Sequence, residues 1–334
     1  MIDPIYSPNP ERYDGTMQYR RSGRSGIMMS ALSLGFWHNF GSISSFANSK
    51  AMMHFAFDQG ITCFDLANNY GPTYGTAEET FGRMMDLSFR PYRDEMFITT
   101  KAGYDMWPGP YGDGGSRKYL MSSLDQSLRR MRLDYVDLFY SHRYDPNTPL
   151  EETLQTLVDI VRRGKALYIG ISRWPLEAAD FAYQYLSERD VPCLCYQGKY
   201  NILHLDEDRE GILRQADDAG VGYVAFSPLQ QGLLTNRYLN GIPEGSRMSR
   251  REALTPDDLS PRLLQQIREL NELAQDRGES LADMALAWVL RRPEVTSVIV
   301  GASSVQQLQD NLRCLESQSF SEQQLDLIED IIHH

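Results

Sequence analysis

The feature that most constrains the fold of this chain is a repeated alternation of short apolar segments with stretches of helical periodicity. Each apolar segment is rich in β-branched or large apolar residues, and a polar loop separates it from the next helical stretch. Continuous apolar strands that alternate with helices are typical of a parallel sheet covered by those helices. Eight segments fit the pattern: residues 31–35, 61–66, 96–100, 136–141, 167–171, 193–197, 222–227 and 296–300.

Helix start and stop signals lie between several of these segments. The stretch Thr76-Ala77-Glu78-Glu79 has the spacing of a capping box. Pro149 suits the first position of a helix, and Gly164 suits its end. Another stretch repeats apolar residues at helical spacing, at Leu120, Leu124, Leu128 and Met131. Eight strand–helix units in 334 residues predict a closed (β/α)8 barrel, the TIM-barrel fold, as a single domain over residues 1–334. An open doubly wound sheet is the alternative.

Two segments lie outside the alternation. Residues 18–30 have the pattern of a short hairpin, which we expect to close the floor of the barrel. Residues 228–264 form a long excursion rich in glycine and arginine, which we interpret as a functional loop, because long loops in compact domains are often functional.

The charge balance limits the classes of partner. The chain has 33 basic and 45 acidic side chains, a formal net charge of −12, which argues against nucleic acid or an anionic membrane as a partner. No basic stretch followed by an apolar one begins the chain, and no run of about 18 apolar residues occurs in it, so we expect a cytoplasmic protein.

Cysteine and histidine spacing gives no sign of a metal or a disulfide framework. Cys63, Cys193, Cys195 and Cys314 lie inside apolar segments, which favours buried free thiols. The six histidines are scattered, without the spacing of a zinc motif, and no metal site is expected.

Titratable side chains follow three successive predicted strands. In a (β/α)8 barrel the chemistry lies at the C-terminal ends of the strands. Asp65 ends the second segment, with Tyr70 in the loop after it, Lys101 follows the third segment and His142 the fourth. We predict that Lys101 lowers the pKa of Tyr70, that Asp65 holds Lys101, and that His142 hydrogen-bonds to a bound carbonyl oxygen. Each residue alone would more often be structural, so the prediction rests on their occurring together.

The later strands end in residues that bind ligands without reacting with them. Ser172-Arg173, Gln197, residues 227–232 and residues 301–304 supply hydroxyls, amides and glycines. Ser304 also has capping-box spacing to Gln307, which predicts a helix start suited to a phosphate. There is no G-x-G-x-x-G, so a Rossmann dinucleotide site is not supported.

The segments GITCFDLANNYG, TTKAGYDMWPGPYGDGGSRKYL, DLFYSHR, GKALYIGIS, SPLQQGLLTNRYLNGIP and VIVGASSVQQLQDNL together resemble the aldo-keto reductases. Within that family the likeness is to the group of L-glyceraldehyde 3-phosphate reductases, which is related to the β-subunits of voltage-gated potassium channels. The resemblance implies a barrel that binds NADPH, with a catalytic tetrad of Asp65, Tyr70, Lys101 and His142 in which Tyr70 donates the proton. It also implies assembly as a tetramer or an octamer.

The resemblance further implies a cofactor site, with residues 228–264 as a long loop that covers the cofactor. Ser172, Arg173 and Gln197 would meet the nicotinamide carboxamide, and Phe226 would stack on its ring. Ser304 stands where relatives often carry an arginine that pairs with the 2′-phosphate. The remaining contacts implied for the cofactor are Ser227, Pro228, Leu229, Gln230, Gly232 and Leu233 at the pyrophosphate, Arg237 and Arg247 at the adenosine phosphate, and Gly301, Ser303, Gln307, Asp310 and Asn311 around the adenosine.

Aromatic residues and an arginine on the predicted loops suit a small aldehyde with an anionic end. The residues expected to line the substrate side are Trp37, His38, Tyr104, Trp107, Arg143 and Trp174. The sequence therefore predicts an NADPH-dependent reductase of small aldehydes or ketoaldehydes, of the glyceraldehyde 3-phosphate or methylglyoxal type. A cofactor-sensing barrel like the channel β-subunits, which carry Asn where this chain has His142, and a barrel enzyme of another reaction class are the alternatives.

Overall fold

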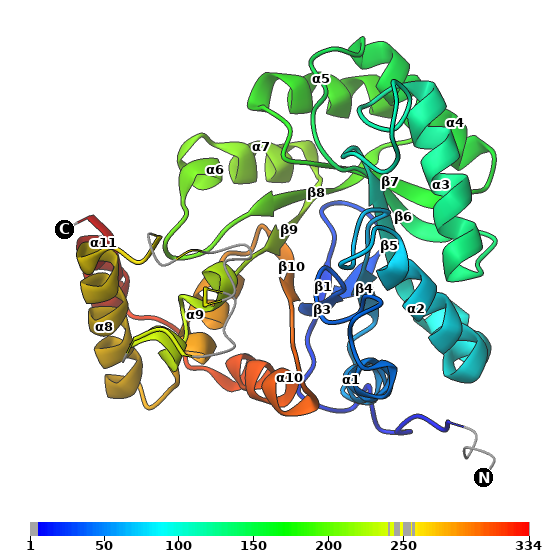
Figure 1. The fold of residues 1–334 in the computed structure, drawn as a ribbon. Helices are drawn as coiled ribbons and strands as arrows, with labels where there is room; N and C mark the ends of the chain where they lie inside the picture. Colours follow the sequence, from blue (N-terminus) through cyan, green and yellow to red (C-terminus); the bar gives the residue numbers. More distant parts are fainter. Residues whose placement is uncertain (1–5, 240, 244–247, 250–254, 256–257, 334) are drawn as a thin grey trace.

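Eight parallel strands close into a barrel, as the sequence predicts, in the computed structural model of the chain (Figure 1). The structure describes residues 6–239, 241–243, 248–249, 255 and 258–333. Around the barrel the strands run in the order β10-β3-β4-β5-β6-β7-β8-β9, with β10 paired to β3, so the sheet has no open edge. The strands are β3 (Leu32–Gly35), β4 (Cys63–Asp65), β5 (Phe97–Ala102), β6 (Val136–Ser141), β7 (Ala166–Ser172), β8 (Cys193–Lys199), β9 (Gly222–Phe226) and β10 (Val295–Val300). The open doubly wound sheet is therefore excluded.

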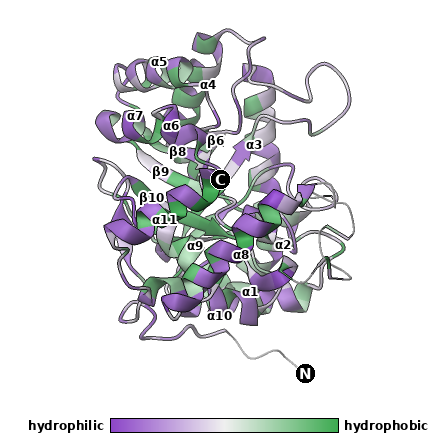
Figure 2. Cartoon of the chain, turned by 90° about the vertical axis from the view of Figure 1, so that its left-hand side faces the viewer, coloured by the Kyte–Doolittle hydropathy of each residue, from purple (hydrophilic) through white to green (hydrophobic). Residues whose placement is uncertain are grey.

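Helices surround the barrel on the outside (Figure 1). Hydrophobic residues gather where the strands lie, and the outer helices carry many of the hydrophilic residues (Figure 2). The helices are α1 (Phe46–Asp58), α2 (Thr76–Met84), α3 (Arg117–Met131), α4 (Leu150–Arg162), α5 (Leu176–Ser187), α6 (Asp206–Arg209), α7 (Ile212–Ala219), α8 (Pro261–Asp276), α9 (Leu281–Leu290), α10 (Val305–Leu312) and α11 (Glu322–His333). None of the helices in the described ranges is both long enough and apolar enough to cross a membrane.

The N-terminal hairpin is also confirmed. It consists of the antiparallel strands β1 (Tyr19–Arg21) and β2 (Met28–Ser30). Its contacts are with residues at the N-terminal ends of barrel strands: the Ser22 hydroxyl donates to the Leu194 carbonyl at the start of β8. Met29 is 2% exposed and packs with apolar side chains from the barrel strands. The hairpin thus closes the end of the barrel opposite to the strand ends that carry the predicted site.

Three local expectations differ from the structure. Gly75, with φ +88°, is the N-cap of α2, and no side chain caps that helix, so the predicted capping box at Thr76 is wrong. The Thr76 hydroxyl instead donates to the Thr73 carbonyl at 2.7 Å. Pro149 is the N-cap of α4 rather than its first residue, and α8 begins at Pro261, so the long excursion ends before residue 264.

The cysteines match the prediction of free, buried thiols. Burial raises the pKa of the Cys195 thiol to about 12, which makes this group unreactive at neutral pH. In the described part of the chain, no group of three or more His, Cys, Asp or Glu side chains is arranged to hold a metal ion.

Candidate active site

Four polar side chains meet at the C-terminal ends of β4, β5 and β6. Asp65 is the last residue of β4, Lys101 is the penultimate residue of β5, and His142 follows β6 directly. Tyr70 lies in the turn between β4 and α2. The exposed fractions are 5% for Asp65, 0% for Lys101 and 8% for His142, so three charged or titratable groups are enclosed in the protein. This placement agrees with the sequence prediction that the four residues come together.

Lys101 is the centre of the cluster. Its Nζ donates to Asp65 Oδ2 at 2.5 Å and to the Leu66 carbonyl at 2.7 Å. The same nitrogen lies 3.4 Å from the Tyr70 hydroxyl oxygen. Burial lowers the pKa of Lys101, and the nearby Asp65 carboxylate opposes this shift. A buried ammonium needs such a partner, because an unpaired charge is costly to take out of water.

Asp65 is itself held from two further sides. Its Oδ1 accepts hydrogen bonds from the Thr99 hydroxyl and from Gln197 Nε2, each at 2.9 Å. Gln197 belongs to β8, on the other side of the barrel mouth, so this contact crosses the barrel. The carboxylate is therefore oriented by a fixed set of donors and directs Lys101 toward Tyr70.

The pKa of Tyr70 differs from the sequence prediction. Burial raises the pKa of this phenol well above its usual value, and the Asp65 carboxylate adds to the increase. At this site the free-energy cost of removing a phenolate from water is larger than the stabilisation that the neighbouring Lys101 provides. Tyr70 is consequently a neutral hydroxyl, and this is the form that can donate a proton.

His142 is neutral for a related reason. Burial lowers its pKa well below the usual value, and the charges of Lys101, Arg173 and Arg143 lower it further. Its ring lies at 71° to that of Tyr70, with 5.8 Å between the centroids. Its Nδ1 is buried without a hydrogen-bond partner in the described structure. A neutral imidazole at this place can hydrogen-bond to a ligand beside Tyr70.

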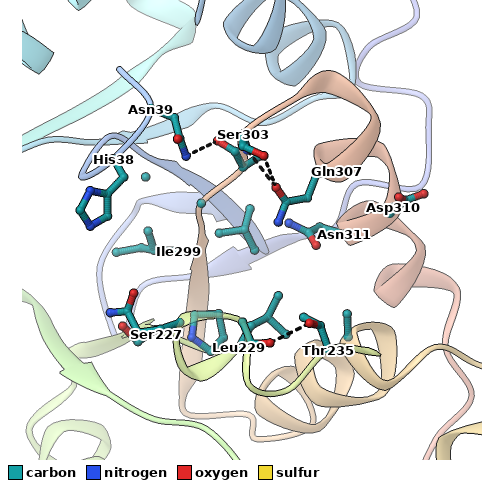
Figure 3. Close-up of a pocket in the computed structure, with 18 of the residues that line it drawn as sticks. His38, Asn39, Ser227, Leu229, Thr235, Ile299, Ser303, Gln307, Asp310 and Asn311 are labelled. Carbon is teal, nitrogen blue, oxygen red and sulfur yellow. Dashed lines mark hydrogen bonds between the residues drawn. The ribbon is translucent and has the colours of Figure 1, made fainter. Parts of the chain in front are cut away.

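A cleft of about 970 Å³ leads from Tyr70 across the barrel mouth. The loop after β9 forms one wall, and the loop after β10 with the start of α10 forms the opposite wall (Figure 3). Ile299 lies between them (Figure 3). Predicted cofactor residues that line the cleft are Gln197, Phe226, Ser227, Pro228, Leu229, Gly232, Arg237, Gly301, Ser303, Ser304, Gln307, Asp310 and Asn311. Arg247 lies outside the described residues.

The start of α10 differs in detail from the predicted capping box. Ser304 is the N-cap, and its hydroxyl accepts from the Gln307 backbone N–H at 3.2 Å. The Gln307 side chain, however, accepts from the backbone N–H and the hydroxyl of Ser303, at 2.9 and 3.0 Å. Gln307 therefore closes the preceding loop instead of returning to Ser304.

The sequence analysis did not single out several residues of the cleft. Asn39, Thr235, Asn236, Ile299, Gln306 and Arg313 also line it. Asn201, fully buried after β8, donates from Nδ2 to the Ser227 carbonyl at 2.9 Å and to Gln230 Oε1 at 3.1 Å. Asn201 therefore anchors the loop after β9. No local pattern marks it, because its partners are 26 and 29 residues away.

The residues expected on the substrate side fall into different positions. Trp37 and His38 line the cleft. Tyr104 stacks edge-on against His142, with 4.8 Å between the centroids, while Trp107 packs against Tyr119. Trp174 is only 2% exposed and packs against Tyr144, so the structure places it in the core instead of on a wall that a substrate could touch.

The chain has a closed parallel barrel with a buried Asp–Lys pair beside a Tyr and a His. Comparison with known families finds a class of protein that has this fold and this site. The chain belongs to the aldo/keto reductase family, whose model matches residues 31–333. This membership makes it an oxidoreductase.

Two groups of named relatives are similar over most of their length. The chain is 54% identical over 325 residues to proteins named L-glyceraldehyde 3-phosphate reductase in Escherichia coli O157:H7 and in Escherichia coli strain K12, covering 96% of this chain and 94% of each relative. It is 35% identical over 307 residues to a probable voltage-gated potassium channel subunit beta of Oryza sativa subsp. japonica, covering 90% of this chain and 92% of the relative.

Proposed function

We propose that this protein reduces small aldehydes or ketoaldehydes, of the glyceraldehyde 3-phosphate or methylglyoxal type, with NADPH as the cofactor and Tyr70 as the proton donor. The observation that carries the proposal is the buried contact of Lys101 Nζ with Asp65 at 2.5 Å, 3.4 Å from the Tyr70 hydroxyl. The 54% identity to proteins named L-glyceraldehyde 3-phosphate reductase supports the choice of substrate.

The residues of the cleft fit a nicotinamide dinucleotide. A volume of about 970 Å³ is at the upper end of the usual range for ligand sites. Asn311 is 3% exposed, lines this cleft, and has an Nδ2 group without a partner in the described structure, as a donor that serves a ligand would. Arg237, exposed on the opposite wall, has no carboxylate within ion-pair distance among the described residues and suits a phosphate.

The proposed chemistry assigns a separate task to each side chain. The reduced nicotinamide, when bound, supplies a hydride to the carbonyl carbon. Tyr70 gives its hydroxyl proton to the carbonyl oxygen, and Lys101 stabilises the phenolate that remains. Asp65 keeps Lys101 charged and oriented toward Tyr70, while neutral His142 hydrogen-bonds to the carbonyl oxygen and positions it. In this scheme the high pKa of Tyr70 keeps the proton in place until the substrate oxygen gains negative charge.

Cofactor titrations are the first test. NADPH and NADH are titrated against quenching of tryptophan fluorescence, to which Trp37 on the cleft contributes, and turnover is followed at the nicotinamide absorbance with glyceraldehyde 3-phosphate and methylglyoxal. We expect tighter binding of NADPH and turnover of at least one aldehyde. Tight binding without turnover would favour a cofactor-sensing role, for which the 35% identity to a protein named as a channel β-subunit is the supporting observation.

Replacing Tyr70 by Phe tests the proton donor. Tyr70→Phe removes the hydroxyl and leaves the ring, so NADPH affinity should stay within about threefold while kcat falls by about 10²- to 10⁴-fold, the usual contribution of a general acid. Stopped-flow absorbance and fluorescence titration measure the two quantities. A variant that keeps more than about a tenth of wild-type kcat would show that another group donates the proton.

The proposal also covers the cellular location and the oligomeric assembly of the enzyme. We propose a cytoplasmic protein that assembles as a tetramer or an octamer. Light scattering coupled to size-exclusion chromatography gives the mass of the particle directly, and a monomer at micromolar concentration would contradict the assembly.

A further inference from the structure

Two arginines lie beside His142 on the side of Tyr104, and their partners differ. Arg143 follows His142 directly, and Arg173 follows the end of β7. The electrostatic influence of both reaches His142, whose pKa each of them lowers. Either could hold an anionic group of the substrate, and the contacts of their guanidinium groups distinguish them. The inference below rests on the proposed function.

The charge of Arg143 is already engaged. Its Nη2 donates to Asp113 Oδ1 at 2.7 Å, and its Nε donates to the Gly103 carbonyl at 2.6 Å. The guanidinium also lies over the Tyr104 ring, 5.1 Å from its centroid. A substrate anion would have to compete with the Asp113 carboxylate for this guanidinium. Arg143 is therefore better suited to holding the loops around Tyr104 in place than to binding an anion.

Arg173 is exposed and keeps its charge available. Among the described residues its guanidinium makes one hydrogen bond, from Nη1 to the Tyr104 hydroxyl at 3.1 Å. No carboxylate of the described residues lies within ion-pair distance of it. The nearby Glu207 carboxylate accepts from the Tyr223 hydroxyl at 2.6 Å and from the Lys199 backbone N–H at 3.2 Å, so its oxygens are used elsewhere.

The backbone holds Arg173 in an unusual conformation. Its φ is +55°, in the left-handed region, which costs a residue other than glycine on the order of 1 kcal/mol. The Arg173 backbone N–H donates to the Gln197 carbonyl at 3.2 Å, which ties this turn to β8. The main chain of residue 173 thus stays beside Gln197, where the carboxamide of the cofactor is proposed to bind, while the side chain reaches Tyr104.

Tyr104 connects Arg173 to the reacting atoms. Its ring is 4.8 Å from that of His142, and His142 is 5.8 Å from Tyr70, both measured between centroids. The guanidinium of Arg173 thus contacts the hydroxyl of Tyr104, whose ring packs against that of His142. We propose that Arg173, and not Arg143, binds the phosphate of a short phosphorylated aldehyde whose carbonyl lies between Tyr70 and His142, and thereby selects phosphorylated substrates.

The test compares two substrates that differ only in the phosphate. The ratio of kcat/KM for glyceraldehyde 3-phosphate to kcat/KM for glyceraldehyde is measured in the wild type, Arg173→Gln, Arg173→Lys and Arg143→Gln. Loss of a charge-assisted hydrogen bond should lower this ratio by about 10- to 100-fold in Arg173→Gln. Arg173→Lys should recover part of the ratio, and Arg143→Gln should change it by less than about threefold, even if both rates fall.

Each other pattern overturns the inference. An unchanged ratio in Arg173→Gln, with weaker NADPH binding by fluorescence, would assign the side chain to the cofactor. A larger fall of the ratio in Arg143→Gln would assign the phosphate to Arg143.

A binding measurement separates the inference from the proposed function. Calorimetry with glycerol 3-phosphate, which carries the phosphate but no carbonyl, does not depend on turnover. Binding that is weakened at least about tenfold in Arg173→Gln supports the phosphate site even if no aldehyde is reduced. Absence of binding to the wild type, with and without NADP⁺, contradicts the phosphate site whatever the enzyme reduces.

Discussion

A second buried ion pair joins the outer helices α2 and α3, and it is hydrogen-bonded to β5 at the residue before Lys101. Glu78 on α2 is 0% exposed. Its carboxylate accepts from the Thr100 hydroxyl at 2.6 Å and from Arg130 Nε on α3 at 2.7 Å. The negative charge of Glu78 also raises the pKa of Lys101 against the lowering effect of burial. Glu78 is therefore a positioning residue that supports the charge of Lys101 without touching the substrate.

Replacing Glu78 by Gln should affect both stability and the pH profile. Arg130 would lose the counter-charge of a buried pair, and we expect the free energy of unfolding in urea to fall by about 2–4 kcal/mol. The pKa of Lys101 would lose a raising influence and fall further. Activity that needs the ammonium would then be lost at lower pH, so the basic limb of the kcat/KM profile should shift downward.

Asp86→Asn is the matched control for this prediction. Asp86 pairs with Arg90 and Arg132 on the surface, where the side chains are 41–49% exposed. Such a pair contributes less than about 1 kcal/mol to stability. Asp86 is not among the charges that shift the pKa of Lys101. Equal effects of Glu78→Gln and Asp86→Asn on the basic limb of the kcat/KM profile would show that Glu78 does not support the charge of Lys101.

At the scale of elements, the loop after β9 is held in a conformation that its sequence does not favour. Ser227, Gln230 and Gln231 have φ values of +53°, +44° and +59°, which are costly for residues other than glycine. The two hydrogen bonds from buried Asn201 cross to this loop and help to hold it. The shape of this wall of the cleft therefore depends on β8 as well as on the loop itself.

Asn201→Ala should loosen this wall. Losing two buried hydrogen bonds costs about 1–3 kcal/mol, and we expect NADPH to bind about tenfold more weakly, with a larger change in the KM for NADPH than in kcat. Asn48→Ala is the comparison: Asn48 donates to the Ser303 carbonyl of the opposite wall at 2.9 Å, but in an exposed position. Fluorescence titration that finds the same loss of affinity in both variants would contradict a special role of the buried contact.

The strand ends could be predicted because the information in them is local. An apolar run that stops at Asp65, Lys101 or His142 shows both the strand and the polar residue that follows it, and barrel closure then brings the three together. Trp174 and Thr76 could not be predicted in the same way. Whether Trp174 faces a ligand or Tyr144 depends on packing between distant segments, and the left-handed Gly75 displaced the cap expected at Thr76.

In the whole molecule, the hairpin that closes the barrel and the candidate active site lie at opposite ends of the barrel. The hairpin covers the N-terminal ends of the strands, and Arg20 donates from its guanidinium to the Leu290 and Arg292 carbonyls near the start of β10. The hairpin thus joins the beginning of the chain to the last strand. The cleft and the Asp65–Lys101 pair lie at the other end, as is usual for catalytic sites in this fold.

Met29 and Met28 offer a direct test of this separation, because they are neighbours in β2 that face opposite ways. Met29 is 2% exposed and packs inside the barrel floor, whereas Met28 is 47% exposed. Met29→Ala should leave a cavity and lower the free energy of unfolding by about 2–5 kcal/mol, while Met28→Ala should change it by less than about 0.5 kcal/mol. Below the unfolding transition, kcat/KM of both variants should remain close to that of the wild type, because the reacting groups lie at the opposite ends of the strands. A stable Met29→Ala protein with impaired kcat/KM would instead show that packing in the floor is transmitted along the strands to Lys101.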